Sequence, residues 1–282
     1  SWWPRPHDKN LGAWVNKYLV ACNLCGADAF DIVFAEGEAQ VHRVVRCKQC
    51  QLMYANPRLA EVEGDDILTY DPAYLPELLA QGDSRLDKEK FQVVDYNDSR
   101  QWLAQRFPGR GELFEVGSSY GYLLAHFQQD GWRVHGVEPN ALNARFASER
   151  LGLPVTAALL PDVQWLSASK DAALMMHVIE HVPDPKATLQ EIHRILKPNG
   201  ILIMETPRYD SWAFQLLGRR ERSMSCDGHI YFFTVETLGK LAQQSGFEIL
   251  KTDIVGRSLS LDRLLWNVGV VSKSRVIANA LT

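Results

Sequence analysis

Two pairs of cysteines near the start of the chain constrain its fold more than any other feature. Cys22 and Cys25 form one C-x-x-C pair, and Cys47 and Cys50 form the second. Four thiolates at this spacing can hold one ion in a tetrahedral site and close the intervening chain into a loop of short strands. The pairs therefore predict a structural Zn²⁺ site, in an amino-terminal zinc-binding module over residues 1–60. Two redox dithiols or disulfides are the alternative, which tandem pairs at this spacing favour less.

The composition indicates a globular protein with one large and one small domain. The chain has 282 residues, of which 46% are hydrophobic and 23% are charged. Its net charge of -4 gives no bulk attraction for nucleic acid, so a nucleic-acid partner is not expected. The sequence has no apolar run of the ~18 residues that a membrane span needs, and residues 1–6 lack the apolar core of a signal peptide. Because zinc-binding thiolates require a reducing compartment, we expect a cytoplasmic protein.

After residue 109 the sequence alternates between short apolar strands and helical stretches. This alternation predicts an α/β fold with a doubly wound sheet and helices on both of its faces. Residues 61–108 are interpreted as a helical linker or cap, and residues 257–282 as a helical tail that either completes the domain or contacts a second copy of the chain. Within the domain placed at 109–256, the predicted strands are 113–116, 134–138, 155–158, 172–176, 201–205 and one starting at 247, and the predicted helices are 122–130, 141–151, 185–196 and 234–246.

The turn after the first of these strands has the features of a nucleotide-binding turn. It runs from Gly117 to Gly121, and in a doubly wound sheet it lies where ligands bind, at the carboxyl ends of the strands. Glu138 ends the next strand, where an acid can bind both hydroxyls of an adenosine ribose. The dinucleotide pattern G-x-G-x-x-G matches at one glycine only. The pattern E-x-G-x-G-x-G of S-adenosylmethionine enzymes matches better, at Glu115, Gly117 and Gly121, with Ser119 in the middle position. An ordinary tight turn beside a surface acid is the alternative.

Together these stretches resemble the class I S-adenosylmethionine-dependent methyltransferases, over about residues 105 to 255. The resemblance is to the branch that contains the ubiquinone-biosynthesis O-methyltransferases and many sugar and natural-product enzymes, and it implies a Rossmann-like sheet of seven mostly parallel strands. The cysteine module resembles a zinc module fused to that branch, although Gln51 stands where glycine is expected. The stretches that carry the resemblance are 113–121, 137–139, 177–185 and 196–202, with 52–58 after the cysteine pairs.

The resemblance implies roles for the residues around the expected cofactor, S-adenosylmethionine. Gly117 and Ser119 are expected to pass its methionine part, in the turn that Gly121 closes, while Glu115 orders this turn from beneath. Glu138 is expected to bind both ribose hydroxyls. Pro139 and Ala158 are expected to contact the adenine. His177 is expected to lie close to the methionine end of the cofactor.

Two histidines are the candidate catalytic bases. Methyl transfer to a hydroxyl needs a base with a pKa near neutrality, which favours histidine. His229 is the first choice, because its stretch resembles one in sugar C-methyltransferases where a Glu-His pair is the acid and base; here Gly228 replaces the acid. His181 is the second choice. For both histidines, a contact with the helix end, backbone or cofactor pocket is the alternative.

The stretch from His177 to His181 also reads H-x-x-E-H, the pattern of inverted zinc peptidases. We reject that interpretation, because the peptidase motif needs a helix and this stretch leaves a buried strand and meets Pro183. In the ubiquinone-type enzymes the corresponding stretch, E-x-x-E-H, is associated with a divalent metal. His177 takes the first position here, so a catalytic metal stays open.

The leading hypothesis is a methyltransferase for a small hydroxylated molecule, such as a sugar, a nucleotide-sugar or a natural-product intermediate, with O-methylation as the reaction. A sugar C-methyltransferase is one alternative. Another is an RNA methyltransferase that uses the zinc module for recognition, which would need a basic face that the acidic chain does not favour. A third is a zinc adaptor on a degenerate nucleotide-binding fold. The oligomeric state stays open, with a homo-oligomer among the possibilities.

Overall fold

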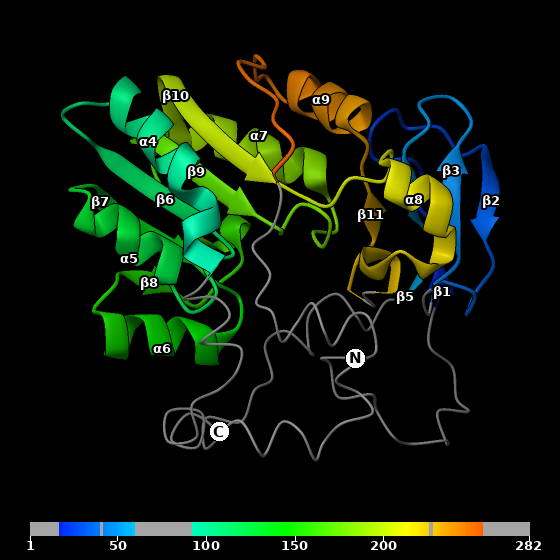
Figure 1. Ribbon diagram of the computed structural model, residues 1–282, viewed down its shortest axis with the longest axis horizontal. Coiled ribbons are helices and arrows are strands. Elements are labelled where there is room, and N and C mark those ends of the chain that lie inside the picture. Colours follow the sequence, from blue (N-terminus) through cyan, green and yellow to red (C-terminus); the bar gives the residue numbers. More distant parts are fainter. Residues whose placement is uncertain (1–16, 40–41, 60–91, 226–227, 256–282) are drawn as a thin grey trace.

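The computed structural model of the protein contains a larger part built on a parallel sheet and a smaller part built on an antiparallel sheet (Figure 1). Two expected segments lie wholly or partly outside the residues that the structure describes: all of the tail at 257–282, and residues 61–91 of the linker expected at 61–108. None of the helices in the described part is long and apolar enough to cross a bilayer. The structure describes residues 17–39, 42–59, 92–225 and 228–255.

A parallel sheet with the strand order β10-β9-β6-β7-β8 forms the centre of the larger part. The chain runs outward from β6 to β8 on one side, then crosses to β9 and β10 on the other. This order confirms the predicted α/β fold and places a switch point between β6 and β9, where ligands bind in such sheets. The strands are β6 (Glu112–Val116), β7 (Arg133–Val137), β8 (Val155–Thr156), β9 (Lys170–Met176) and β10 (Leu196–Glu205).

The expected count of seven strands is not found among the described residues, where the parallel sheet has five. The strand expected from residue 247 onward is absent, although residues 247–255 are described. Ile249 and Leu250 stay exposed. In a strand, neighbouring side chains point to opposite faces, so a strand here would bury one of the two in the core. Because both are exposed, residues 247–250 do not add a strand to the edge of the sheet.

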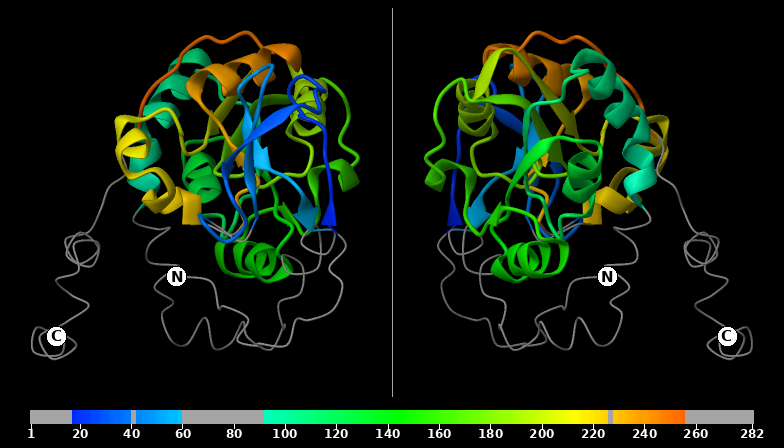
Figure 2. Two further views of the ribbon diagram at one scale, coloured as in Figure 1. Left: turned by 90° about the vertical axis from the view of Figure 1, so that its right-hand side faces the viewer. Right: turned by 90° about the vertical axis from the view of Figure 1, so that its left-hand side faces the viewer.

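Helices cover both faces of the parallel sheet, as predicted. Leu113 of β6 packs with Leu103 of α4 and Leu124 of α5 on one face, while the next residue, Phe114, packs with Ile192 of α7 on the other. Because neighbouring side chains of a strand point to opposite faces, each strand contributes to two apolar cores. Helices α6 and α9 lie on opposite sides of the molecule in all three views (Figure 1, Figure 2). The helices are η2 (Val93–Tyr96), α4 (Asn97–Arg106), α5 (Tyr122–Gln129), α6 (Ala141–Leu151), η3 (Leu160–Asp162), α7 (Pro185–Ile195), α8 (Trp212–Leu217), η4 (Gly218–Arg220), η5 (Arg222–Ser225) and α9 (Val235–Gln244).

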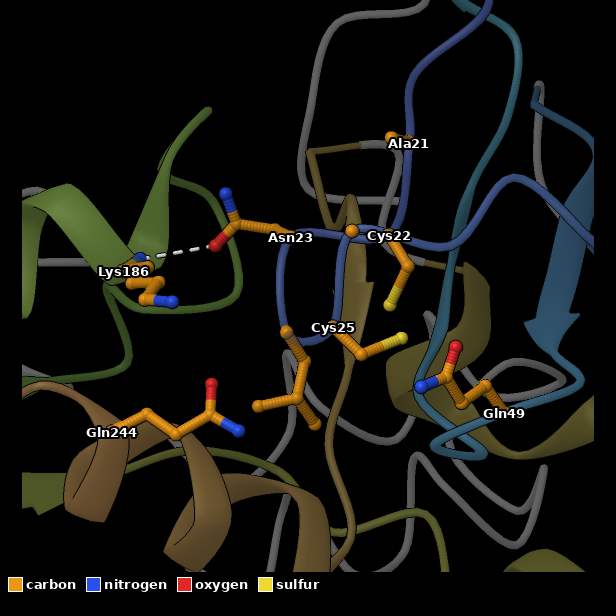
Figure 3. A pocket seen from close by; sticks show the side chains of 9 residues that line it. Ala21, Cys22, Asn23, Cys25, Gln49, Lys186 and Gln244 are labelled. Atoms are coloured by element: carbon orange, nitrogen blue, oxygen red, sulfur yellow. Dashed lines mark hydrogen bonds between the residues drawn. The ribbon is translucent and has the colours of Figure 1, made fainter.

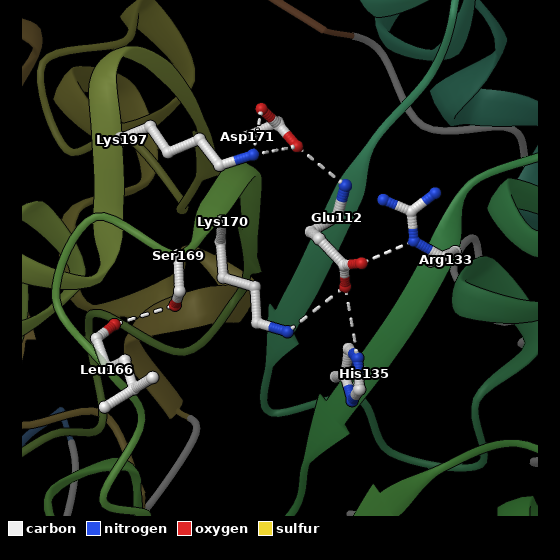
Figure 4. A network of polar contacts seen from close by, with 8 residues as sticks. All are labelled: Glu112, Arg133, His135, Leu166, Ser169, Lys170, Asp171 and Lys197. Carbon is white, nitrogen blue, oxygen red and sulfur yellow. Dashed lines mark hydrogen bonds and ion pairs between the residues drawn. The ribbon is translucent and has the colours of Figure 1, made fainter.

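Ion pairs tie the strands together at their amino ends (Figure 4). Glu112 accepts a hydrogen bond from Arg133 Nε at 2.5 Å, and its other oxygen lies 3.4 Å from Lys170 Nζ. Asp171 binds Lys197 Nζ at 2.8 Å and also accepts the backbone N–H of Glu112 at 2.8 Å. Burial acts to raise the pKa of Glu112, but the bonds from Arg133 and Lys170 outweigh it and lower that pKa. The turn from Gly117 to Gly121, called the nucleotide-type turn below, lies at the opposite end of the sheet. The network of ion pairs therefore stabilises the end of the sheet away from this turn.

The antiparallel sheet, with the order β11-β4-β3-β2, takes strands from both parts of the sequence. Three of its strands come from residues 1–60, but β11 comes from the region between α8 and α9. Tyr231 of β11 pairs with Tyr54 of β4, and Phe232 pairs with Met53. In Figure 1, β11 lies beside the blue strands of the amino-terminal region. The strands of the smaller part are β1 (Lys17–Tyr18), β2 (Phe30–Phe34), β3 (Val44–Cys47), β4 (Met53–Ala55), β5 (Arg58–Leu59) and β11 (Tyr231–Phe232), with β1 paired to β5.

Candidate functional site

The four cysteines of the two C-x-x-C pairs converge as their spacing predicts. Their sulfur atoms all lie within 4.8 Å of one another, with 3.3 Å between Cys22 and Cys50 and 3.5 Å between Cys25 and Cys47. No disulfide joins them, since all four thiols are free and a disulfide requires an S–S distance of ~2.0 Å. A tetrahedral site with Zn–S bonds of ~2.3 Å has its sulfurs roughly 3.8 Å apart. The residues present therefore fit a single four-coordinate ion.

Each cysteine pair forms a knuckle that ends on a residue with positive φ. Gly26, with φ of 75°, donates its N–H to Cys22 O at 2.7 Å, and Gln51, with φ of 66°, donates to Cys47 O at 3.0 Å. Gln51 is the position where glycine was expected, because glycine adopts this conformation without strain. Its side-chain amide compensates by donating to Cys47 O at 3.3 Å and to Lys48 O at 3.1 Å. The second knuckle thus keeps its shape without the glycine.

The turn between β6 and α5 has the conformation that a closely approaching ligand needs. Gly117, Ser119 and Gly121 all have positive φ, at 71°, 47° and 81°. A Cβ atom added at Gly117 would lie 2.3 Å from Val178 Cγ2, and one at Gly121 would lie 2.7 Å from Leu153 Cδ1. Both glycines are therefore required by packing as well as by backbone conformation. The contact of Gly117 with Val178 also brings the loop after β9 against this turn.

Glu138 lies immediately after β7 and binds the turn directly. Its carboxylate accepts the N–H of Ser119 at 2.8 Å and the N–H of Asn140 at 2.9 Å. Only 7% of the residue is exposed, and this burial raises the pKa of the carboxyl, although the two N–H bonds act in the opposite direction. Each carboxylate oxygen has a second lone pair, so both can still accept a ribose hydroxyl. Glu115, in β6 two residues before Gly117, is buried, at 3% exposure.

The positions expected to contact adenine lie at the same edge of the sheet as this turn. Pro139 follows Glu138 at the end of β7, and Ala158 follows the neighbouring strand β8 by two residues. Both are half-buried. The structure therefore brings them to adjacent strand ends, and their contact with a cofactor stays a prediction.

A cluster of histidine and glutamate side chains surrounds the end of β9. His177, which has a φ of 55°, places its Nε2 2.7 Å from Glu205 Oε1 at the end of β10. The side chain of Glu180 is completely buried, with Oε1 3.5 Å from His177 Nδ1 and 3.9 Å from His229 Nε2. Its other oxygen accepts a hydrogen bond from the Thr206 hydroxyl at 2.9 Å. The cluster joins residues from two strand ends and from the loop before β11.

The two candidate bases, His181 and His229, lie against each other in this cluster. Their ring centroids are 4.7 Å apart. His181 Nδ1 donates to the carbonyl of Gly228 at 2.7 Å, and His229 Nδ1 lies 3.1 Å from the hydroxyl of Tyr209. A Cβ at Gly228 would lie 3.1 Å from His181 Nδ1, so a side chain there would press on the ring. The carboxylate of Glu180 lies 3.9 Å from His229 Nε2.

Burial and charge set the protonation states in the cluster. Burial, with a smaller effect of the charge on His181, lowers the pKa of His229 to about 4, so this ring is neutral at pH 7 but its pKa lies below the near-neutral value expected of the base. Burial acts to raise the pKa of Glu180, but the hydrogen bond from His177 and the charge on His181 outweigh it, and the pKa is lowered. One ligand atom each from Glu180, His181 and His229 lies within 4.8 Å of the others. These three residues could also hold a metal ion.

Sequence reasoning did not single out several residues of this cluster. Glu180 lies in the H-x-x-E-H stretch, but no role was predicted for it. Glu205 ends the predicted strand 201–205. Because the ends of parallel strands meet at one edge of a sheet, this position indicated that Glu205 lies near His177. No signal in the sequence predicted the bond of Tyr209 to His229. Thr206 gave no signal.

The chain matches a family described as a methyltransferase domain over residues 87–252. It is 32% identical over 112 residues to a ubiquinone biosynthesis O-methyltransferase of Paramagnetospirillum magneticum, a match that covers 38% of this chain and 45% of the relative. It is 30% identical over 178 residues to the ubiquinone biosynthesis O-methyltransferase of Ruegeria pomeroyi, covering 58% of this chain and 70% of the relative. The solved 1,6-didemethyltoxoflavin-N1-methyltransferase of Burkholderia thailandensis, with bound S-adenosylhomocysteine, is 18% identical with a TM-score of 0.48, covering 74% of this chain and 90% of that chain.

The family match covers more than half of the chain, so the chain belongs to the methyltransferase-domain family. This confirms the resemblance to S-adenosylmethionine-dependent methyltransferases and identifies the five-stranded sheet as the Rossmann-like sheet of that fold. The chain spans about half the length of the first curated relatives that it matches. Their reactions and substrates therefore enter the functional argument only as proposals.

Proposed function

We propose that the protein transfers a methyl group from S-adenosylmethionine to a hydroxyl of a small molecule, such as a sugar, a nucleotide-sugar or a natural-product intermediate. One observation carries this proposal: His181 and the buried His229 lie against each other, and the loop of His181 packs on the turn from Gly117 to Gly121 through the contact of Val178 with Gly117. Relatives named as ubiquinone biosynthesis O-methyltransferases support the choice of a hydroxyl acceptor.

The residues of the turn fit the cofactor in this proposal. Gly117 and Ser119 pass the methionine part, and Glu138 accepts the two ribose hydroxyls while it holds the turn through the Ser119 N–H. Glu115 supports the turn from below, and Pro139, Ala158 and His177 complete the contacts at the two ends of the cofactor. When bound, S-adenosylmethionine supplies an electrophilic methyl group on a sulfonium.

His229, or His181 as the second choice, takes the proton of the acceptor hydroxyl in this proposal. As the hydroxyl oxygen forms its bond to the methyl carbon and the carbon–sulfur bond breaks, the proton moves to the ring nitrogen that carries no hydrogen. Tyr209 fixes the ring of His229 through Nδ1, and the carboxylate of Glu180 stabilises the imidazolium that forms. A divalent cation held by Glu180, His181 and His229 is a second way to acidify the hydroxyl, and their convergence favours it.

Transfer of a labelled methyl group tests this function. With S-adenosylmethionine as donor, small hydroxylated acceptors are expected to gain the label on oxygen, and analogues whose hydroxyl is already methylated are expected to stay unlabelled. Label on carbon would identify a sugar C-methyltransferase. Label on RNA, with binding that weakens steeply as salt increases, would identify the RNA-modifying alternative. Failure to label any acceptor while S-adenosylmethionine binds would contradict the proposed reaction.

We further propose that the four cysteines hold one structural zinc ion. Reduced, purified protein is expected to carry about one zinc per chain, as a single Cys₄ site requires. Cys47→Ser removes one of the four ligands and should lose most of the metal, whereas the matched variant Cys226→Ser, at the cysteine that belongs to neither pair, should keep it. Elemental analysis of both variants measures this, and folded, reduced wild-type protein without zinc would overturn the assignment.

A further inference from the structure

The amino-terminal module shares one apolar core with the larger part of the protein. Cys22 and Tyr54 belong to the same buried cluster as Tyr231 of β11, Phe233 directly after this strand, and Leu189 of α7. The cysteine site is therefore not on a separate lobe. Its side chains pack against the face of the parallel sheet that α7 and α9 cover.

The strand that follows His229 is held between the module and the histidine cluster. The N–H of Ala55 in β4 donates to Ile230 O at 2.8 Å, and Tyr231 continues the pairing with this strand. The N–H groups of Ile230 and Tyr231 both donate to the backbone carbonyl of Glu180, at 2.9 and 3.1 Å. The backbone immediately after His229 is thus fixed by β4 from one direction and by Glu180 from the other.

Arg58 connects the module to the loop that follows His181. Its Nη1 donates to Pro183 O at 2.8 Å, and the residue is buried, with 6% exposure. The guanidinium lies 4.8 Å from the centroid of the Tyr231 ring, and the Tyr231 hydroxyl donates to the same carbonyl of Pro183 at 3.1 Å. One arginine of the module therefore holds both the loop of His181 and the strand of His229.

Asn23, between the cysteines of the first knuckle, contacts the start of α7 (Figure 3). Its side-chain amide donates to Asp184 Oδ1 at 2.8 Å and accepts the N–H of Lys186 at 3.0 Å. Asp184 is the residue that caps α7. In Figure 3 the Asn23 side chain points toward Lys186, while the sulfurs of Cys22 and Cys25 point away from it. The fold of the knuckle thus fixes the chain three residues after His181.

We infer that the cysteine module positions the two histidines, so that Asn23 and Arg58 are positioning residues of the histidine site. This inference rests on the proposed function only for the catalytic use of His181 and His229. The nucleotide-type turn takes its hydrogen bonds from elsewhere: Gly117 donates to Val137, and Ser119 donates to Glu138. Disturbing the module should therefore disturb the histidines and leave the turn in place.

Hydrogen–deuterium exchange on the full, zinc-loaded chain tests this inference without an activity assay. In Arg58→Ala and Asn23→Ala, amides in 177–186 and 228–234 are expected to exchange up to roughly tenfold faster than in the wild type, as the loss of one or two intramolecular hydrogen bonds predicts. Amides in 112–124 should not change. Asp31→Asn is the control, since it removes an ion pair with Lys48 inside the module and touches neither histidine loop.

Activity and binding provide the second readout. Both positioning variants should lower kcat while the Kd for S-adenosylmethionine stays within about twofold of the wild type. Unchanged exchange in both histidine segments, or equal acceleration in 112–124, would overturn the inference. If Arg58→Ala does not fold, Asn23→Ala decides the outcome, because one of the two bonds of Asn23 is exposed and the other is only partly buried. If the wild type transfers no methyl group, the proposed function fails, whereas the exchange result still decides the inference.

Discussion

Replacing Glu138 with alanine is expected to weaken S-adenosylmethionine binding by about 30- to 1000-fold, measured by calorimetry. Two charge-assisted hydrogen bonds to ribose hydroxyls are together worth ~2–4 kcal/mol, which corresponds to that range. The substitution also leaves the N–H groups of Ser119 and Asn140 without their acceptor, which adds to the loss because Ser119 lies in the turn. Both effects lower affinity.

Two further variants separate these effects. Glu138→Gln keeps one acceptor oxygen and the shape of the side chain, so its affinity should fall between those of the wild type and Glu138→Ala. Glu149→Gln, on the exposed face of α6 where it pairs only with Arg145 among the described residues, should bind as the wild type does. An affinity that is unchanged in Glu138→Ala would rule out the ribose role of this carboxylate.

Replacing the general base is expected to lower the rate of methyl transfer by ~10²–10⁴, the usual contribution of such a group. We expect this loss in His229→Ala, with cofactor affinity near that of the wild type. If His181 only shapes the pocket, His181→Ala should change affinity and rate together. Single-turnover kinetics on both variants measures this, and His126→Asn on α5, outside the cluster, serves as the control.

The pH dependence of the rate provides an independent check on His229. A base accepts a proton only when it is neutral, and the pKa of His229 is lowered to about 4 by its burial. The neutral form therefore persists from pH 8 down to pH 6, and the rate should fall only as the pH decreases toward this pKa. Full activity in His229→Ala would refute its role, and a defect in turnover alone in His181→Ala would transfer the role to that residue.

The elements set by local sequence periodicity were predictable. The helix over Ala141–Leu151, the strand before the turn from Gly117 to Gly121 and the helix after this turn lie where the pattern placed them, since period and capping residues are local properties. The C-x-x-C spacing likewise predicted that four sulfurs converge. Asp184 and Thr234, at the starts of two predicted helices, cap α7 and α9.

The features that depend on distant contacts were not predictable. Nothing in residues 231–232 shows that they pair with β4, because the partner lies about 180 residues earlier and the strand is two residues long. The burial of Glu180 was not predictable for a related reason. A carboxylate is completely buried only where charged or polar partners surround it, and one of these partners, His229, lies far along the sequence. The strand expected at Phe247–Leu250 was wrong, because an apolar pattern does not ensure that a neighbouring edge is available for pairing.

Calorimetric titration of the full, zinc-loaded protein with S-adenosylmethionine tests the central claim most directly. The account predicts saturable binding to about one site per chain, with S-adenosylhomocysteine competing for the same site. NAD should not compete, since the turn has only the first of the three glycines of the dinucleotide pattern, with Ser119 and Tyr122 at the other two positions. Absence of S-adenosylmethionine binding, or tight binding of NAD at this turn, would contradict the account.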